Sequence, residues 1–382
     1  MLKTKSPKNY YLATAVMVGY IIGVGMFGLP WLVSRAGIIT FGFFIISLGL
    51  VQYLLHLIYA NIILATKTYH RLPGYAGVYL GKKGKGLVFV AKLLGNYSAL
   101  LAYIIITGIF LNQLLGPYFG GSEFLYASAL FLLEAVITYF GIQAIAKAEL
   151  VMTGSLLLVV GLIAWQGRHF IEAGNYITLD WKYFLLPYGA TLFALDGGGS
   201  LPIVAKLLGR QARAMKSVIR LSALLSVATI TVFTLVIVGI SGAQTSPDAL
   251  AGVKLILNDG VIFFSLIFGV LTMVTSFLGV AEAIRETLWW DFKLHKNLAW
   301  ALAIFIPYIM YLLNIKNLIW IISFAGAVAG GLSAIILIMI FKKLRPQKLF
   351  LFKRRLPDMI TSLLILLFGC GIIYEIYYLL IK

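Results

Sequence analysis

Charged residues and the residue types that build metal or disulfide sites are scarce in this 382-residue chain. Only 12% of the residues are charged, and cysteine occurs once, as Cys370. A single cysteine can form neither an internal disulfide nor a cysteine metal cluster. The four histidines, His56, His70, His169 and His295, are scattered without the HExxH spacing of a zinc protease. We therefore expect neither a resident cofactor nor enzyme activity.

Polar segments long enough to form a soluble domain are also missing. Hydrophobic residues make up 61% of the chain and the mean hydropathy is +0.98, values typical of multi-span membrane proteins. The net charge of +18 is dispersed between apolar runs, which argues against a nucleic-acid surface. The sequence predicts an all-α integral membrane protein with a single transmembrane domain over residues 1–382, in contact with lipid and not with nucleic acid.

Eleven apolar runs, each of roughly 20 residues, are long enough to cross a bilayer as helices. Lysine and arginine are concentrated in the N-terminal segment and in every second loop, including 67–85, 206–220 and 342–355. Because cytoplasmic loops carry the excess of these residues, we expect a cytoplasmic N-terminus and a location in the cytoplasmic (inner) membrane. The expected spans are 10–34, 38–66, 87–115, 124–141, 146–167, 183–208, 217–240, 260–284, 298–314, 317–341 and 359–381.

The first span contains the unusual stretch Ile22-Gly23-Val24-Gly25-Met26-Phe27-Gly28-Leu29-Pro30. An unpaired backbone N–H or C=O costs several kcal/mol in hydrocarbon. Irregular backbone is therefore tolerated at that depth only where it is buried in protein or lines a wet cavity. The stretch predicts a broken helix at a binding site.

The sixth span repeats this feature in Phe193-Ala194-Leu195-Asp196-Gly197-Gly198-Gly199-Ser200-Leu201-Pro202. Glycine interruptions at corresponding positions of two halves indicate the midplane site of an inverted-repeat transporter. Spans 1 and 6 are five helices apart, which is the spacing that such a repeat requires. Glycine and proline are also common in ordinary membrane helices, and close helix packing is the simpler explanation of either break alone.

Polar residues form stripes on three further spans. Asn96, Tyr103 and Thr107 share one face of span 3, since their spacing matches the helical repeat. Small residues on span 10 favour close packing against another helix. Gln52 and His56, one turn apart, are expected to hydrogen-bond to a neighbouring helix. The stripe on span 8 comprises Thr272, Thr275, Ser276, Gly279 and Glu282, and that on span 10 comprises Ser323, Gly326, Ala327, Gly330 and Ser333.

Ionisable residues inside predicted spans are functional candidates, because a charge in the membrane is costly. Asp196 adjoins the break of span 6 and is the strongest of them. Glu282, with Arg285 close by, is expected to form an ion pair at the cytoplasmic end or to relay protons. Glu134 and Glu375 are expected to pair with neighbouring polar groups or to approach an interface.

These motifs resemble the amino acid/auxin permease family of the amino acid-polyamine-organocation superfamily. The resemblance is carried by the two glycine-rich breaks, by the segment from Leu101 to Ile104, by Gly141-Ile142-Gln143 and by the segment from Thr275 to Val280. It covers nearly the whole chain and is closest to the bacterial aromatic and hydroxy amino acid permeases of the tryptophan/tyrosine type. That aromatic branch commonly carries a His-containing segment where this chain has Asp196 and three glycines.

The resemblance implies a LeuT-type fold, with two inverted five-helix repeats at 9–168 and 177–341, discontinuous helices 1 and 6, and an extra helix at 358–382. It further implies ion-coupled symport of neutral amino acids by alternating access, in which a monomer suffices. The expected substrate site comprises Gly23, Val24, Gly25, Met26, Phe27, Tyr103, Phe193, Asp196, Gly197 and Gly198.

Two coupling ions and one further class of substrate are consistent with the sequence. A proton would use Asp196 or Glu282, because desolvation favours the neutral acid. Sodium would use the Ile22 carbonyl with the hydroxyls of Thr275 and Ser276, since a hard cation prefers oxygen ligands. Proton coupling is the favoured reading. Asp196 could alternatively recognise an amine or a cationic amino acid, which would make the protein an amine transporter or an exchanger.

Overall fold

The computed structural model describes the chain except residues 1–6, 141–144, 255, 258, 353 and 382. The expected link Gly141-Ile142-Gln143 therefore lies outside the described residues. Helices account for most of the rest, as the long apolar runs predict. The eight longest continuous ones are α3 (Ile38–Ala65), α4 (Leu72–Phe119), α5 (Glu123–Phe140), α6 (Ile145–Gly167), α9 (Ala212–Ser241), α10 (Asp259–Glu286), α11 (Lys296–Leu312) and α14 (Asp358–Ile381).

The first span is broken where the glycines predict it. Helix α1 (Pro7–Ile21) ends before Gly23, α2 (Gly25–Ala36) begins after it, and the two segments are bent by 48°. Pro30 lies inside α2 and does not interrupt it. The break therefore comes from Gly23 and its neighbours rather than from the proline.

The sixth span is broken in the same way. Helix α7 (Tyr188–Ala194) is separated from α8 (Leu201–Leu208) by irregular chain and by the short 3-10 turn η3 (Gly198–Ser200). Pro202 stands in the first turn of α8, where its missing N–H removes no helical hydrogen bond. Discontinuity of helices 1 and 6 is thus confirmed.

The tenth span changes its winding in the middle. Helix α12 (Leu318–Phe324) passes into a π-helical segment, η7 (Ala325–Gly330), and then into α13 (Gly331–Lys342). Its small residues allow close contact with α7: a Cβ atom added at Gly326 would overlap the carbonyl oxygen of Gly189. The close packing predicted for this stripe is confirmed. π-Helical segments inside α-helices are frequent at functional sites.

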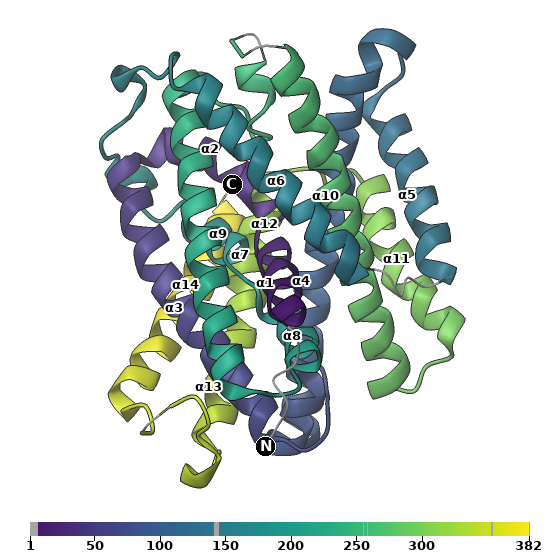
Figure 1. The fold of residues 1–382 in the computed structure, drawn as a ribbon, viewed down its shortest axis with the longest axis vertical. Helices are drawn as coiled ribbons and strands as arrows, with labels where there is room; N and C mark the ends of the chain where they lie inside the picture. The colour runs from purple at the N-terminus through teal and green to yellow at the C-terminus, as the bar shows by residue number, and fades with distance from the viewer. Residues whose placement is uncertain (1–6, 141–144, 255, 258, 353, 382) are drawn as a thin grey trace.

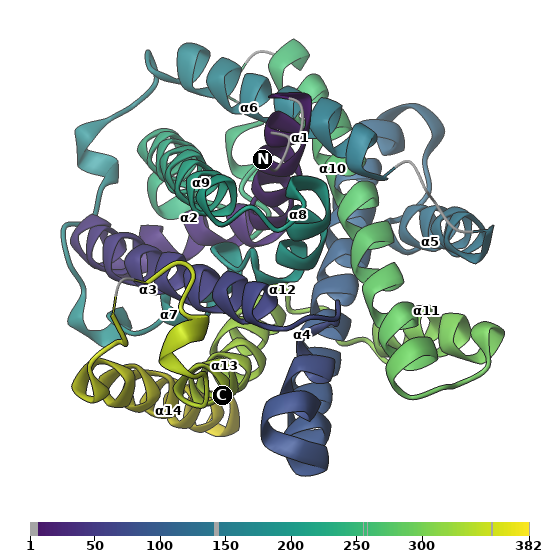
Figure 2. The same cartoon turned by 60° about the horizontal axis from the view of Figure 1, so that its bottom comes forward.

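The broken helices occupy the middle of the bundle. Figure 2 shows α1, α8 and α12 among the long helices α3, α4, α6, α9 and α10, and α7 packs against α12, η7, α2 and α3. Helices α5 and α11 lie at one edge, and α14 lies at another edge on the far side of the bundle (Figures 1 and 2). Irregular backbone is therefore buried in protein and kept away from lipid, as a bilayer requires.

Nine helices of the described chain are long and apolar enough to cross a membrane, and the bent pair α1 and α2 makes ten. The run expected over 298–314 corresponds to α11, which is apolar but only 17 residues long. The protein is a multi-pass membrane protein, and the count of eleven spans stays a prediction. Helix α4 begins at Leu72, well before the expected 87, and carries a non-helical kink at Gly81, where φ is 75°.

Candidate functional site

The two breaks meet around a small cavity. Gly23 and Gly25 come from span 1, Phe193 and Asp196 from span 6, and Tyr103 from α4. This break cavity measures about 60 Å³, which is room for a few water molecules rather than for an amino acid. The remaining wall consists mainly of small residues, namely Ala91, Gly95, Ala99, Ala325, Ala329, Gly330 and Ser333.

Glycines let the two breaks touch through their backbones. A Cβ atom at Gly25 would lie 2.8 Å from the Cα of Ala194, and one at Gly197 would lie 2.6 Å from Cγ1 of Ile21. Real Cβ atoms do not come that close to other atoms. At Gly25 the obstacle includes backbone, so only glycine fits there, whereas a larger residue at Gly197 would require the Ile21 side chain to shift. A Cβ at Gly23 would lie 3.3 Å from the Tyr103 hydroxyl, which places that hydroxyl directly over the first break.

Two side chains of α3 bond to the backbone of the sixth span on either side of its break. Gln52 donates from Nε2 to the carbonyl of Leu192 at 3.1 Å, and Gly197 donates its N–H to Nε2 of His56 at 2.9 Å. The predicted interhelical role of this pair is confirmed. His56 Nδ1 is buried and has no hydrogen-bond partner among the described residues. It borders a second cavity of about 50 Å³, the His56 cavity, which Gln52 and Asp196 also line.

Asp196 uses both of its carboxylate oxygens. Oδ1 accepts the N–H of Gly198 at 2.9 Å, which ties the side chain to the 3-10 turn that follows. Oδ2 lies 3.7 Å from Nζ of Lys92 on α4. Among the described residues, Asp196 is the only acidic one that lines the break cavity.

Lys92 is one of two site residues, with Arg71, that the sequence analysis missed. It lies on the same face of α4 as Asn96, Ala99 and Tyr103, because separations of four, seven and eleven residues return close to the starting direction of a helix. All four residues line the break cavity. The sequence did contain one indication of this role, because Lys92 stands one helical turn before Asn96, at the start of the polar stripe recognised on span 3.

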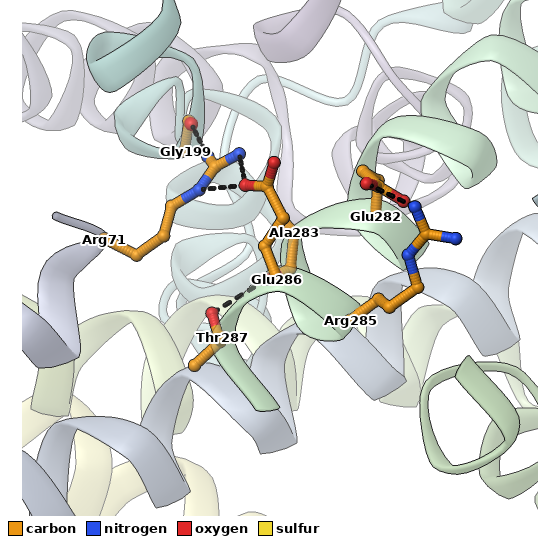
Figure 3. Close-up of polar contacts among 7 residues, drawn as sticks. All are labelled: Arg71, Gly199, Glu282, Ala283, Arg285, Glu286 and Thr287. Atoms are coloured by element: carbon orange, nitrogen blue, oxygen red, sulfur yellow. Dashed lines mark hydrogen bonds and ion pairs between the residues drawn. The ribbon is translucent and has the colours of Figure 1, made fainter. Parts of the chain in front are cut away.

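A second ion pair, between Arg71 and Glu286, lies on the side of the site where α4 begins. Arg71 donates from Nε and Nη2 to Oε2 of Glu286 at 3.3 and 2.9 Å, and from Nη1 to the carbonyl of Gly199 at 3.1 Å (Figure 3). The guanidinium thus links the sixth-span break to the end of α10. A third cavity of about 40 Å³, the Arg71 cavity, lies between this pair and Lys92.

Glu282 does not line any of these three cavities. Its carboxylate pairs with Arg285 at 2.7 Å (Figure 3). Arg285 also donates to the carbonyl of Thr138 on α5. The expected ion pair of Glu282 with Arg285 is confirmed.

Several other expected site residues point elsewhere. Val24, Met26 and Phe27 are buried but do not line the break cavity. The ring of Phe27 packs edge-on against Phe110 and Phe233, with ring centroids 5.1 and 5.5 Å apart. In this structure Phe27, which was expected in the substrate site, packs in the core, because helical geometry turns it about 200° from Gly25, which does face the cavity.

The residues expected to hold sodium also lie outside the lining of the break cavity. Thr275 donates its hydroxyl to the carbonyl of Thr272 at 3.0 Å, and the buried Ser276 hydroxyl has no partner among the described residues. Ile22 is fully buried in the break. Gly198 lines the His56 cavity, whereas the backbone of Gly197 is bound to His56.

A larger cavity, about 680 Å³, lies toward the other end of α4 from Arg71, where Ile105 and Ile109 line it. Its wall also includes Trp31, Asp248, Lys316, Ser323 and Glu375. We refer to it as the Glu375 cavity. Glu375 reaches it from α14 and is only 3% exposed. Glu134, also buried, lies on α5 and lines none of these cavities.

Comparisons with known proteins agree with this architecture. A sequence model of the tryptophan/tyrosine permease family matches residues 6–375. No curated protein matches the chain. Among solved structures, the crystal structure of MhsT in complex with L-phenylalanine superposes with a TM-score of 0.71 at 14% sequence identity, covering 98% of each chain. At that identity the likeness shows a shared LeuT-type fold.

Proposed function

The chain belongs to the tryptophan/tyrosine permease family, and we propose from this premise that it is a secondary active transporter of neutral, aromatic or hydrophobic amino acids. A member of a permease family is a transporter and not an enzyme. The observation that carries the proposal is the break cavity, in which glycine backbone from span 1 faces Asp196 from span 6. Backbone and one carboxylate at the midplane are the groups that a zwitterion needs.

The two ends of the substrate match the two breaks. The positive dipole end of α2 begins at Gly25 and suits the substrate carboxylate, with the Tyr103 hydroxyl next to it. Asp196 and the carbonyls at the end of α7 suit the ammonium group. Phe193 and the alanines of α4 and η7 offer an apolar wall to the side chain. Because the cavity measures only about 60 Å³ here, the proposal requires it to widen when substrate enters.

The cavities support alternating access with the Arg71 side facing the cytoplasm. That side is closed by Arg71, Glu286 and Gly199, while the larger Glu375 cavity occupies the other side. This orientation agrees with the cytoplasmic N-terminus expected from the basic loops. We propose eleven spans in the cytoplasmic membrane, built from repeats at 9–168 and 177–341 with 358–382 as an extra helix, and a monomer suffices for the cycle.

The proposed coupling ion is a proton bound at Asp196. A protonated carboxyl keeps one oxygen that can accept a hydrogen bond from the substrate ammonium, so proton and substrate can be bound together. Sodium is the second candidate, because the Ser276 hydroxyl is buried without a partner among the described residues and could serve as a ligand.

Uptake of labelled amino acids into proteoliposomes under an imposed proton or sodium gradient tests the proposal. We expect accumulation of aromatic amino acids under a proton gradient. In Asp196→Asn, accumulation above the outside concentration should be lost while exchange of internal for external substrate survives. Asp358→Asn, an exposed aspartate that lines none of the four cavities, serves as the control.

Three outcomes would change the account. Accumulation by Asp196→Asn at the wild-type level would overturn the coupling role of this carboxyl. Accumulation under a sodium gradient alone would favour the second coupling ion. Absence of uptake for every amino acid, together with uptake of decarboxylated amines, would contradict amino acid transport.

A further inference from the structure

Lys92 belongs to the break cavity and not to a membrane surface. Its side chain is 25% exposed, and its Nζ lies 3.7 Å from Oδ2 of Asp196. The residue lines the break cavity, the His56 cavity and the Arg71 cavity. A lysine inside a membrane span is costly. Its position at the junction of three cavities therefore calls for a functional explanation.

The two oxygens of Asp196 are held in different ways. Oδ1 is fixed by the Gly198 N–H, which belongs to the same turn of the chain. Oδ2 is approached by a long, flexible side chain at a distance well beyond the 2.7–2.9 Å of a tight charge-assisted hydrogen bond. The contact with Lys92 is thus the more easily exchanged of the two.

We propose that Lys92 is a tethered substitute for the substrate ammonium, which pairs with Asp196 in the empty carrier and leaves when substrate arrives. This inference rests on the proposed function and deepens it. An ammonium group from the substrate and the ammonium group of Lys92 need the same oxygen of Asp196. Both cannot use it at once, so binding of one releases the other.

The Arg71 cavity offers the released side chain a place to go. It adjoins Lys92 and is lined by Tyr20, Tyr59 and Asn96, whose hydroxyl and amide oxygens can accept hydrogen bonds. Lys92 is about 16 Å nearer the start of α4 than Tyr103, at 1.5 Å per residue. The released ammonium therefore moves toward the Arg71 side, away from the first break. No covalent bond changes in this step.

Pairing in the empty carrier also explains how the site resets. Once substrate and proton have left, an unpaired carboxylate in a low-dielectric site would be strongly unfavourable. Lys92 compensates that charge, so the carrier can return without a bound ion. Without Lys92, the carboxyl can return only by keeping its proton, which carries the coupling proton back out, so that no net proton enters and the gradient no longer drives uptake. The charged and titratable groups that line the break cavity or the His56 cavity with Asp196 are Lys92 and Tyr103 on α4, His56 and Tyr59 on α3, and Tyr20 on α1.

The variant Lys92→Met separates this role from a structural one. We expect the apparent affinity for zwitterionic substrate to rise about tenfold, because the internal competitor is gone, while gradient-driven accumulation falls by at least about tenfold. Exchange should continue. Lys92→Arg, which keeps the charge, should behave like the wild type in both measurements. Lys83→Met, an exposed lysine on the same helix, is the matched control.

The outcomes are decisive in either direction. Weaker substrate binding in a folded Lys92→Met protein would show that Lys92 contacts the substrate directly and would overturn the proposal. Unchanged affinity and accumulation would overturn it as well. If the wild type itself neither accumulates nor exchanges any amino acid, the proposed function fails instead. Thermal melting in detergent verifies that each variant is folded.

Discussion

The two helix breaks share glycines but are held in different ways. The first break closes on itself: Gly23 donates to the carbonyl of Ile21, Met26 to that of Gly23, and Phe27 to that of Val24. The sixth break has local bonds of the same kind, from Asp196 to the carbonyl of Phe193 and from Ser200 to that of Gly197, but it is also bound from outside by side chains of α3 and by Arg71 and Lys92. The first break thus supplies fixed backbone for recognition, while the sixth supplies a charge whose partners can change.

The largest expected effect comes from separating the two breaks. In Gly25→Val the new side chain would have to occupy space 2.8 Å from the Cα of Ala194 and 2.9 Å from the Phe193 ring. Backbone cannot move aside as a flexible side chain can. We expect uptake to fall by about a hundredfold, as displacements of about 1 Å at a site commonly cause. Proteoliposome uptake measures this effect.

Gly42→Val on α3 is the control, since no atom lies within 4 Å of the added Cβ. It should retain uptake. Wild-type uptake by Gly25→Val would mean that the close contact of the breaks is not needed for transport.

A smaller effect is expected from removing one outside partner of the sixth break. His56→Leu leaves the N–H of Gly197 without its acceptor, which should lower the free energy of unfolding by about 1–3 kcal/mol. His169→Leu, at an exposed position, should change it by less than about 0.5 kcal/mol. Thermal melting in detergent compares the two variants. Equal stability of the two variants would show that the bond from Gly197 to His56 does not help to hold the sixth break. The distinction between the two breaks would then fail.

Both breaks could be predicted from the sequence because glycine and proline are easily recognised inside long apolar runs. Tyr103 and the pair Gln52 and His56 were also found, since a polar residue on a repeated helical face must meet something polar. The facing direction of residues next to a break was not predictable. A new half-helix starts with its own phase, so Gly25 faces the cavity while Phe27 joins the core.

The two basic residues of the site were missed for another reason. Lys92 and Arg71 lie near the expected start of span 3, where lysine and arginine ordinarily mark the cytoplasmic side. Counting lysine and arginine in the loops treats every such residue as a marker of the cytoplasmic side. Only the folded chain shows that Lys92 reaches Asp196 and that Arg71 reaches Gly199 and Glu286.

Substrate protection of a cysteine in the break cavity tests the central claim most directly. Cys370 is replaced by serine, and Ala99→Cys places a thiol on the cavity wall, where α4 passes the two breaks. Ser323→Cys places a thiol in the Glu375 cavity as the comparison. The labelling rate of each is measured with a small thiol reagent, with and without an aromatic amino acid. The account predicts that the amino acid slows labelling at position 99 more than at position 323. Protection at 323 with none at 99 would place the substrate in the Glu375 cavity and contradict the account.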